Sequence, residues 1–270
     1  MQIINKIVSL KKNGIFEISQ RKLPLLKNNK IRVKIKAVGV CASDIPRAYD
    51  NGAYNYPLVM GHEVTGEIFE SNIKKFRTGD RVVIFPLIPC KKCNYCKTKN
   101  YNHCENYSYY GSREDGGYAQ YIDVYAWNIL KITKKISFLD SFALEPSAVA
   151  LNTINILFKK KPKINEKVLV LGSGFIGLLI ISLLKIKYKK LDLTIIDRND
   201  HKLKMVPRNF KKFNLKKDIT NIDKLYKEFD YIIETTGSNK LIAEIFKFAK
   251  NKCSIALMGN INDDVSFKKK

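Results

Sequence analysis

Four cysteines lie close together in the first half of the chain. They are spaced as Cys90-x2-Cys93-x2-Cys96-x7-Cys104, which brings four thiolates within reach of one tetrahedral ion. Zinc accepts thiolate ligands, and a shell of four leaves no position for a substrate. The spacing therefore predicts a structural zinc site. Short cysteine repeats also hold iron–sulfur clusters, but this spacing matches neither of the common ferredoxin patterns.

The rest of the composition limits the alternatives. The six cysteines could form disulfides, but no N-terminal stretch resembles an export signal, which favours metal binding and predicts a soluble, cytoplasmic protein. The formal net charge of +24 is compatible with a nucleic-acid surface. Because the lysines are scattered through both halves, we favour a general compositional bias over nucleic-acid binding. Such a charge would also help to attract an anionic substrate or dinucleotide.

A second set of metal-binding side chains lies outside the cysteine cluster. Cys41, His62 and Glu145 would supply three protein ligands and leave the fourth position for water or a substrate oxygen, which is the pattern of catalytic zinc. Taken singly, Cys41 is more simply interpreted as a buried small residue, and His62 as a hydrogen-bonded histidine of the core. Spacing alone does not decide between a catalytic zinc site and ordinary core residues.

A glycine-rich loop in the second half predicts a dinucleotide site. Gly172-Ser-Gly-Phe-Ile-Gly177 follows a short apolar run, expected to be a strand, and opens an apolar segment of helical length. The first glycine allows the tight turn, the second lets the backbone approach the pyrophosphate, and the third permits close helix packing. The predicted cofactor-binding residues of this loop are Gly172, Gly174, Phe175, Ile176 and Gly177.

The acid after the next expected strand bears on the choice of cofactor. Asp197 lies 20 residues after Gly177, where a carboxylate binds the ribose hydroxyls and repels a 2′-phosphate. This position favours NAD over NADP. Arg198 weakens the preference, since an arginine there accepts a 2′-phosphate.

The two halves differ in pattern. Residues 30–38 alternate apolar and polar side chains, and shorter strand-like runs follow at 61–70, 81–85 and 118–124. From about residue 151, compact apolar runs alternate with helical segments, which predicts a doubly wound parallel sheet. We therefore expect an α/β protein with a β-rich domain over 1–151 and a dinucleotide-binding domain over 152–270.

Together, these motifs resemble the zinc-containing medium-chain alcohol dehydrogenases, and a glutamate at position 145 resembles the sorbitol-dehydrogenase branch. The resemblance implies a GroES-like catalytic domain followed by a Rossmann domain, two zinc ions and NAD. The motifs that carry it, in chain order, are Cys41-Ala-Ser-Asp44, Gly61-His-Glu-x2-Gly-Glu67, the four cysteines, Asp115-Gly-Gly-x-Ala119, Glu145-Pro146 and Gly172-x-Gly-x2-Gly177.

The resemblance also implies roles for individual residues. Zinc at Cys41, His62 and Glu145 would lower the pKa of a substrate hydroxyl. Asp44 would orient the histidine ligand, and Ser43 would begin the relay that carries the proton to solvent. Glu63, directly after the ligand His62, would either enter the coordination shell or support it, and is grouped with them as a catalytic residue.

Part of the sequence, including Gly111-Ser-Arg113-x-Asp115-Gly-Gly117, resembles those relatives that act on sugar-alcohol phosphates. It implies hydride transfer from a substrate like galactitol 1-phosphate to NAD, giving a ketose phosphate. Arg47 is the predicted phosphate contact because a planar guanidinium suits a phosphate, and Tyr49 and Tyr54 would line the polyol pocket. A dehydrogenase of free polyols or other secondary alcohols is the alternative.

The sequence stops at Lys270, before the last strand of the family's Rossmann sheet. We therefore expect a C-terminally truncated sheet. Members of the family dimerise partly through that strand, so the dimer contact is expected to be weakened or lost. A zinc- and NAD-binding protein without activity is a further alternative.

Overall fold

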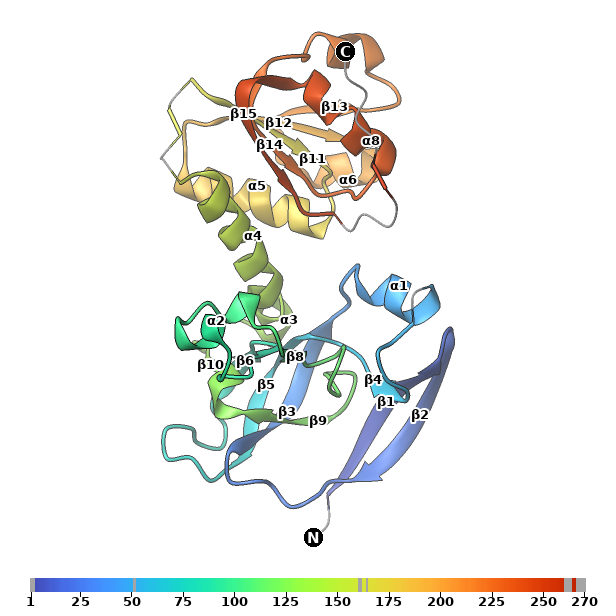
Figure 1. The fold of residues 1–270 in the computed structure, drawn as a ribbon, viewed down its shortest axis with the longest axis vertical. Coiled ribbons are helices and arrows are strands. Elements are labelled where there is room, and N and C mark those ends of the chain that lie inside the picture. The colour runs from blue at the N-terminus through green and yellow to red at the C-terminus, as the bar shows by residue number, and fades with distance from the viewer. Residues whose placement is uncertain (1–2, 51, 160–161, 164, 260–263, 266–270) are drawn as a thin grey trace. The chain divides into compact units, whose positions relative to one another are not determined.

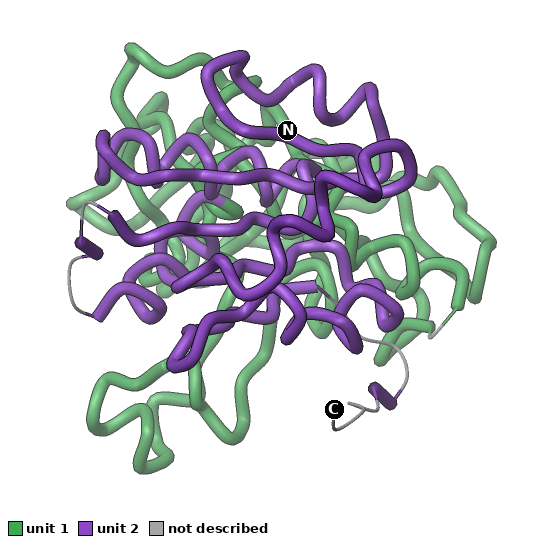
Figure 2. The backbone as a smooth tube through the Cα atoms, turned by 90° about the horizontal axis from the view of Figure 1, so that it is seen from above, with its two compact units in different colours: residues 1–146 green, residues 147–270 purple. Residues whose placement is uncertain are grey.

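The computed structural model describes residues 3–50, 52–159, 162–163, 165–259 and 264–265. The chain forms two compact units, residues 1–146 and 147–270, which are coloured separately in Figure 2. Helix α4 (Leu144–Leu157) begins at the end of the first unit and continues into the second (Figure 1). The boundary predicted between residues 151 and 152 falls inside this helix.

The first unit is built from antiparallel sheets. A five-stranded sheet has the order β10-β6-β5-β3-β9, a three-stranded sheet has the order β2-β1-β4, and β7 pairs with β8. Their bounds are β1 Ile4–Lys12, β2 Ile15–Lys22, β3 Lys30–Gly39, β4 Leu58–Val59, β5 Glu63–Ser71, β6 Arg81–Ile84, β7 Leu87–Ile88, β8 Ser108–Tyr109, β9 Tyr121–Tyr125 and β10 Ile129–Lys131; the helices are α1 Asp44–Tyr49, α2 Asn94–Lys97, η1 Tyr101–His103, η2 Ala126–Asn128 and α3 Phe138–Ser141.

Strand β3 departs from the simple alternation expected for residues 30–38. Ile31 and Val33 are buried in the core of the five-stranded sheet, as expected, but Arg32 between them is also buried. Its guanidinium lies 2.8 Å from Asp123 and 3.0 Å from Glu70, on the two neighbouring strands. The cation can be buried because these carboxylates offset its loss of hydration.

The second unit is a five-stranded parallel sheet with the order β13-β12-β11-β14-β15. The chain runs outward from β11 on one side and resumes at β14 on the other, so the switch point of the sheet lies between β11 and β14. The element bounds are β11 Lys167–Leu171, α5 Phe175–Lys187, β12 Asp192–Asp197, α6 Asp200–Met205, β13 Lys211–Asn214, α7 Ile219–Asp223, β14 Phe229–Glu234, α8 Asn239–Ala243, η3 Ile245–Lys247 and β15 Ala249–Leu257.

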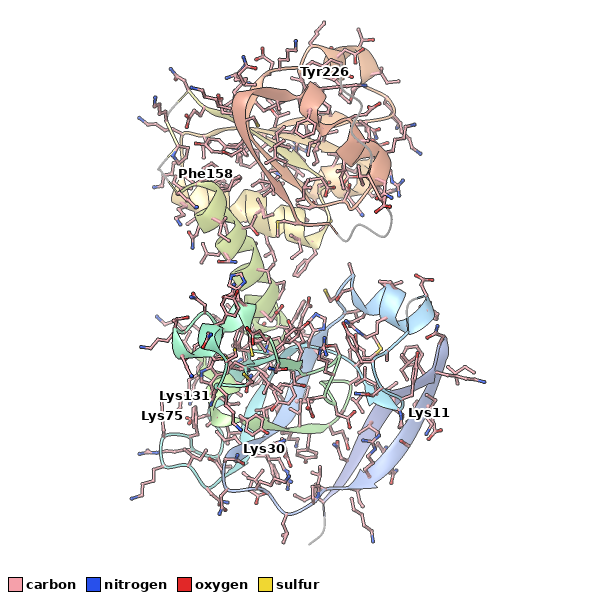
Figure 3. All side chains as sticks on the ribbon, in the orientation of Figure 1. Lys11, Lys30, Lys75, Lys131, Phe158 and Tyr226 are labelled. Carbon is pink, nitrogen blue, oxygen red and sulfur yellow. The ribbon has the colours of Figure 1, made fainter. Side chains whose placement is uncertain are left out.

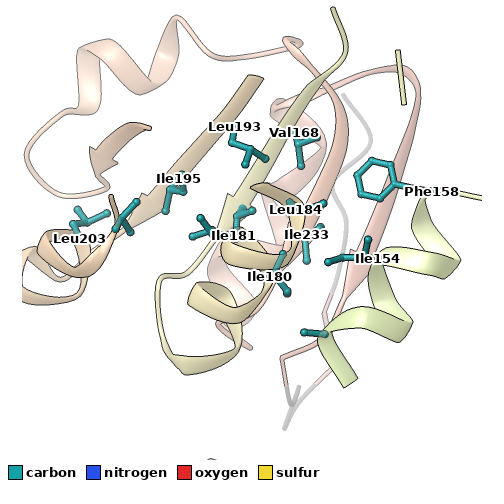
Figure 4. Packing of buried hydrophobic residues seen from close by; sticks show 13 residues of the cluster. Ile154, Phe158, Val168, Ile180, Ile181, Leu184, Leu193, Ile195, Leu203 and Ile233 are labelled. Carbon is teal, nitrogen blue, oxygen red and sulfur yellow. The ribbon is translucent and has the colours of Figure 1, made fainter. Parts of the chain in front are cut away.

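Both faces of this sheet are buried, which explains its continuous apolar strands. Val168 and Val170 of β11 pack with residues of α4 and α5 on one face (Figure 4). Leu169 and Leu171 point to the opposite face, where they pack with residues of α8 and η3. The predicted α/β fold with a parallel sheet is confirmed.

The lysines are spread over separate elements. Lys11, Lys30, Lys75 and Lys131 in Figure 3 belong to β1, β3, the segment after β5, and β10. Several lie close to an acid or a ring: the Lys11 ammonium is 3.4 Å from a Glu17 oxygen, and the Lys30 ammonium is 4.9 Å from the centre of an aromatic ring. Among the described residues, no helix is long and apolar enough to cross a membrane.

Replacing Ile180 by alanine should test the packing of α5 on the sheet. Ile180 is fully buried, so Ile180→Ala should lower the free energy of unfolding of the second unit by about 2–5 kcal/mol, measured by urea denaturation. Ile186→Ala is the matched control, because Ile186 lies on the same helix and is 74% exposed. It should change the stability by about 0.5 kcal/mol or less. Equal losses in the two variants would contradict the packing described.

Candidate functional site

The four clustered cysteines converge in the segment between β7 and β8. Their sulfur atoms all lie within 4.8 Å of one another. Cys90 Sγ is 3.9 Å from Cys96 Sγ, and Cys93 Sγ is 4.0 Å from Cys104 Sγ. These distances are far too long for disulfide bonds, but they are close to the separation of about 3.8 Å expected between sulfurs around tetrahedral zinc. The residues therefore fit a structural zinc ion.

The surroundings of the cysteines shift the pKa values of their thiols in different directions. Backbone N–H groups of Cys93 and Lys92 point at Cys90 Sγ and lower the pKa of that thiol to about 6. Burial acts in the opposite direction on Cys96 and raises the pKa of its thiol to about 12. A metal ion would hold both sulfurs in the thiolate form.

A second group of metal-binding atoms forms where β3 ends and β5 begins. Cys41, His62 and Glu63 each bring one ligand atom within 4.8 Å of the others. The antiparallel register of β3 and β5 places Gly39 opposite Glu63, so the residues that follow one strand meet those that begin the other. His62 and Glu63 are buried. One sulfur, one nitrogen and one carboxylate are a donor set that zinc accepts.

The carboxylate of Asp44 supports this group. Its oxygen Oδ2 accepts hydrogen bonds from the Cys41 backbone N–H and the Tyr118 hydroxyl, both at 3.1 Å. Its oxygen Oδ1 lies 3.4 Å from Arg47 and 3.5 Å from His62 Nδ1. Ser43 caps the N-terminus of α1 beside Asp44, and its side chain makes no capping hydrogen bond.

The environment of His62 favours a positive charge. Burial alone would lower its pKa, but the carboxylate of Asp44 and the sulfur of Cys41 raise the pKa to about 10. Nδ1 is buried without a good hydrogen bond among the described residues. Since Nδ1 faces Asp44, the other ring nitrogen is the one that a metal ion would use, as in carboxylate–histidine–zinc arrangements. A bound cation would replace the proton.

Glu145 lies outside the group formed by Cys41, His62 and Glu63. It lies in the first turn of α4, and its Oε1 accepts a hydrogen bond of 3.4 Å from the Tyr109 hydroxyl. The Tyr109 ring also makes an edge contact with the His62 ring, with centroids 5.8 Å apart. Burial raises the pKa of both Glu63 and Glu145. The site therefore contains two carboxylates, of which Glu63 lies with Cys41 and His62 in this structure.

The residues predicted to bind substrate occupy different environments. Arg47 faces inward and pairs with Asp44, so the Asp44 carboxylate partly neutralises its charge. Tyr49 is exposed and packs edge-on against Phe16 of β2. Tyr54 is also exposed, with its ring under the guanidinium of Arg113 at 4.2 Å. Tyr109 and Tyr118 carry no distinguishing signal in the sequence, because tyrosine is frequent in this chain.

The glycine loop joins β11 to α5 at the switch point. Gly172 has a φ of +100°, and a Cβ there would lie 2.5 Å from the Thr235 hydroxyl oxygen. A Cβ on Gly177 would lie 2.2 Å from the Gly172 carbonyl oxygen, whereas a Cβ on Gly174 would meet nothing within 4 Å. Gly174 therefore borders open space at the start of α5, where a pyrophosphate would approach the helix N-terminus.

Asp197 lies at the end of β12 and is tied to this loop. Its Oδ2 accepts hydrogen bonds from the Ser173 backbone N–H at 2.7 Å and from the Ser173 hydroxyl at 3.0 Å. Its Oδ1 accepts one from the Asn199 backbone N–H at 2.9 Å. Carboxylate oxygens can accept more than one bond, so ribose hydroxyls could share them. Arg198 is exposed, as are Phe175 and part of the helix start around Ile176.

Comparison with known proteins places this arrangement in a family. Residues 27–134 match the model of the alcohol dehydrogenase GroES-like domain, and residues 157–256 match that of shikimate/quinate 5-dehydrogenase. Galactitol 1-phosphate 5-dehydrogenase of Escherichia coli K12 is 31% identical over 263 residues, which cover 94% of this chain and 75% of the relative. The chain belongs to the zinc-type medium-chain alcohol dehydrogenases. The family predicted from the sequence is confirmed, and with it the oxidoreductase class.

Other members of the zinc-type alcohol dehydrogenase family give the same picture. Sorbitol dehydrogenase of Bacillus subtilis is 30% identical over 171 residues, covering 60% of this chain and 47% of the relative. The crystal structure of galactitol-1-phosphate dehydrogenase from Escherichia coli superposes with a TM-score of 0.86 at 30% identity, over 97% of this chain and 78% of that one. A structure of the Escherichia coli alcohol dehydrogenase RspB with NADH superposes with a TM-score of 0.87 at 27% identity, over 98% and 79%. The GroES-like and Rossmann-like folds are thereby confirmed.

Replacing one cysteine of the cluster should show what it binds. We expect Cys96→Ser to hold one zinc ion per chain fewer than the unsubstituted protein, measured by elemental analysis of the purified protein, because Cys96 would supply a buried ligand sulfur. Cys253→Ser is the control, since Cys253 lies outside both groups of ligands. It should have the same zinc content as the unsubstituted protein. Full zinc content in Cys96→Ser would rule out the proposed ligand set.

Proposed function

We propose that this protein is a zinc- and NAD-dependent dehydrogenase that oxidises a sugar-alcohol phosphate resembling galactitol 1-phosphate to a ketose phosphate. The observation that carries the proposal is the group formed by Cys41, His62 and Glu63, within 4.8 Å of one another, in a chain whose Escherichia coli relative is named galactitol 1-phosphate 5-dehydrogenase. Three protein ligands leave one coordination position for a substrate oxygen, as catalytic zinc requires.

Cys41 and His62 would hold the catalytic zinc together with one of two carboxylates. The sequence favours Glu145 as the third ligand, whereas Glu63 lies closer to the other two here. When bound, zinc lowers the pKa of a hydroxyl in the open position. A single carboxylate ligand at a time keeps that position free. The second carboxylate would then accept hydrogen bonds beside it, as Glu145 does from Tyr109.

The surrounding residues orient the ligands and move the proton. Asp44 holds the Cys41 backbone and faces His62 Nδ1, which fixes the imidazole for metal binding. Ser43 is the proposed acceptor of the substrate's hydroxyl proton, which it would pass toward solvent. Arg47, Tyr49 and Tyr54 remain the proposed substrate contacts from the sequence.

The second unit would bind the cofactor. Gly172, Gly174 and Gly177 shape the loop at the switch point for a pyrophosphate, and Asp197 favours NAD by binding ribose hydroxyls and repelling a 2′-phosphate. Nicotinamide supplies the hydride acceptor when the cofactor is bound. We further propose that the protein acts in the cytoplasm on a small-molecule substrate.

One observation favours a dehydrogenase of free polyols as the second candidate. Arg47 was predicted to contact the phosphate, but its guanidinium pairs with Asp44. A sorbitol dehydrogenase is also among the relatives. The two candidates make the same demands on the zinc and cofactor sites and differ in whether the substrate carries a phosphate.

NADH formation with paired substrates should distinguish the candidates. We expect the zinc-loaded chain to turn over galactitol 1-phosphate with a kcat/KM at least tenfold higher than that for galactitol, because a charged contact to a phosphate contributes about 1.5–3 kcal/mol. Equal rates with both substrates would favour the free-polyol enzyme. A folded chain that holds zinc and NAD but oxidises neither substrate would be an inactive binding protein.

A substitution at Asp197 should shift the preference between cofactors. Asp197→Asn keeps hydrogen-bonding capacity beside Ser173 and removes the negative charge that repels a 2′-phosphate. We expect the ratio of kcat/KM for NADP to that for NAD to rise about tenfold, which corresponds to about 1.4 kcal/mol. Asp192→Asn is the control, because Asp192 begins the same strand at its opposite end. An unchanged ratio in Asp197→Asn would contradict the proposed role.

A further inference from the structure

A second arginine in the first unit has no acidic partner. The guanidinium of Arg113 lies between two tyrosine rings, 4.2 Å from the centre of Tyr54 and 4.6 Å from that of Tyr107. Within the described part of the chain, no carboxylate lies within ion-pair distance of it, and its buried Nε has no hydrogen-bond partner. Its Nη2 reaches the Tyr107 hydroxyl only at 3.4 Å. The charge of Arg113 is therefore not neutralised.

The acids next to Arg113 in sequence are bound to other groups. The Glu114 carboxylate accepts a hydrogen bond of 3.0 Å from Ser108, and Asp115 pairs with Arg21 at 2.7 Å. Asp115 also accepts a bond from the Val59 backbone N–H at 2.9 Å. Both carboxylates are therefore bound to partners other than Arg113.

The segment that carries Arg113 is fixed against the zinc ligands. A Cβ on Gly111 would lie 2.6 Å from the Gly61 carbonyl oxygen, and one on Gly116 would lie 2.2 Å from the same atom. Gly61 immediately precedes His62, and Tyr109 at the start of the segment contacts the His62 ring. Arg113 thus lies on a short turn whose two ends both pack beside the metal site.

Tyr54, one of the two rings against Arg113, comes from the segment after α1. Tyr54 follows the helix that begins with Asp44, and the side chain of its neighbour Asn55 donates a hydrogen bond of 3.5 Å to the Arg113 carbonyl oxygen. Arg113 is therefore held by Tyr107 of its own segment and by Tyr54 and Asn55, which lie in the chain between Cys41 and His62. Contact with the two rings restricts the orientation of the guanidinium, and its terminal nitrogens make no ion pair within the described part of the chain.

These features distinguish Arg113 from Arg47. Arg47 and His62 both lie beside Oδ1 of Asp44, so the positive charge of Arg47 is paired with the carboxylate that orients His62. A phosphate at one end of a polyol lies several carbon atoms away from a hydroxyl near the other end. Its binding group should therefore lie at the edge of the metal site and carry an uncompensated positive charge.

We propose that Arg113, held between Tyr54 and Tyr107, binds the phosphate of the substrate and determines the preference for phosphorylated over free polyols. The inference rests on the proposed function, which it refines by naming the specificity-determining residue. A guanidinium edge can donate two parallel hydrogen bonds to phosphate oxygens, and a preorganised side chain loses less conformational entropy on binding.

Arg113→Gln, Arg113→Lys and the control Arg21→Gln test the proposal in the full zinc-loaded chain. Arg21→Gln removes a charge from the same region, where Arg21 pairs with Asp115. Calorimetric titration with galactitol 1-phosphate and with galactitol measures binding even without turnover, and steady-state kinetics with NAD separates KM from kcat. Zinc content and circular dichroism show that each variant is folded.

We expect Arg113→Gln to weaken binding of galactitol 1-phosphate about 10- to 100-fold, to raise its KM by a similar factor and to change kcat little. Binding of galactitol should stay within about twofold, as should both ligands in Arg21→Gln. Arg113→Lys should recover part of the loss, because it restores the charge without the planar fork.

Two results would overturn the assignment, and they differ in what they say about the enzyme. If the unsubstituted protein prefers the phosphate and Arg113→Gln retains that preference while Arg47→Gln loses it, the proposed function stands and Arg47 is the phosphate-binding residue. If the unsubstituted protein binds galactitol 1-phosphate no more tightly than galactitol, both the phosphate specificity and the role of Arg113 fail.

Discussion

The first unit depends on one buried carboxylate. Asp44 is 2% exposed and joins its own loop at Cys41 to two parts of the chain that are distant in sequence: His62 just before β5, and Tyr118 before β9. A buried carboxylate requires several donors, and here they include the Cys41 backbone N–H beside the proposed metal site and the Tyr118 hydroxyl. The contacts that compensate the buried Asp44 carboxylate therefore also hold Cys41 and His62 in place.

Local sequence spacing predicted the parts of the protein that depend on local geometry. The four cysteines are spread over few residues, so their convergence follows from the short loop that contains them. The glycine loop was also predictable, because Gly172 and Gly177 approach neighbouring backbone or side-chain atoms too closely for any other residue. The parallel sheet followed from apolar strands that are buried on both faces.

Contacts between distant segments were harder to predict. Tyr109 and Tyr118 support Glu145 and Asp44, but nothing in their immediate sequence separates them from the chain's other tyrosines. The planar guanidinium of Arg47 predicts a phosphate contact, and only the structure shows that this side chain pairs with Asp44. Arg113 belongs to a motif that resembles a family pattern, and its significance depends on two rings brought together by folding. The choice between Glu63 and Glu145 as zinc ligand likewise depends on tertiary packing.

The contact of Gly61 with Gly111 and Gly116 has a consequence for how such enzymes diversify. Because the backbones touch there, the turn from residue 111 to 116 is anchored at both ends next to the metal ligand. Residues at its tip can then vary without moving the proposed metal ligands. Evolution, or a protein engineer, could exchange the substrate-recognising tip while inheriting the same reactive centre.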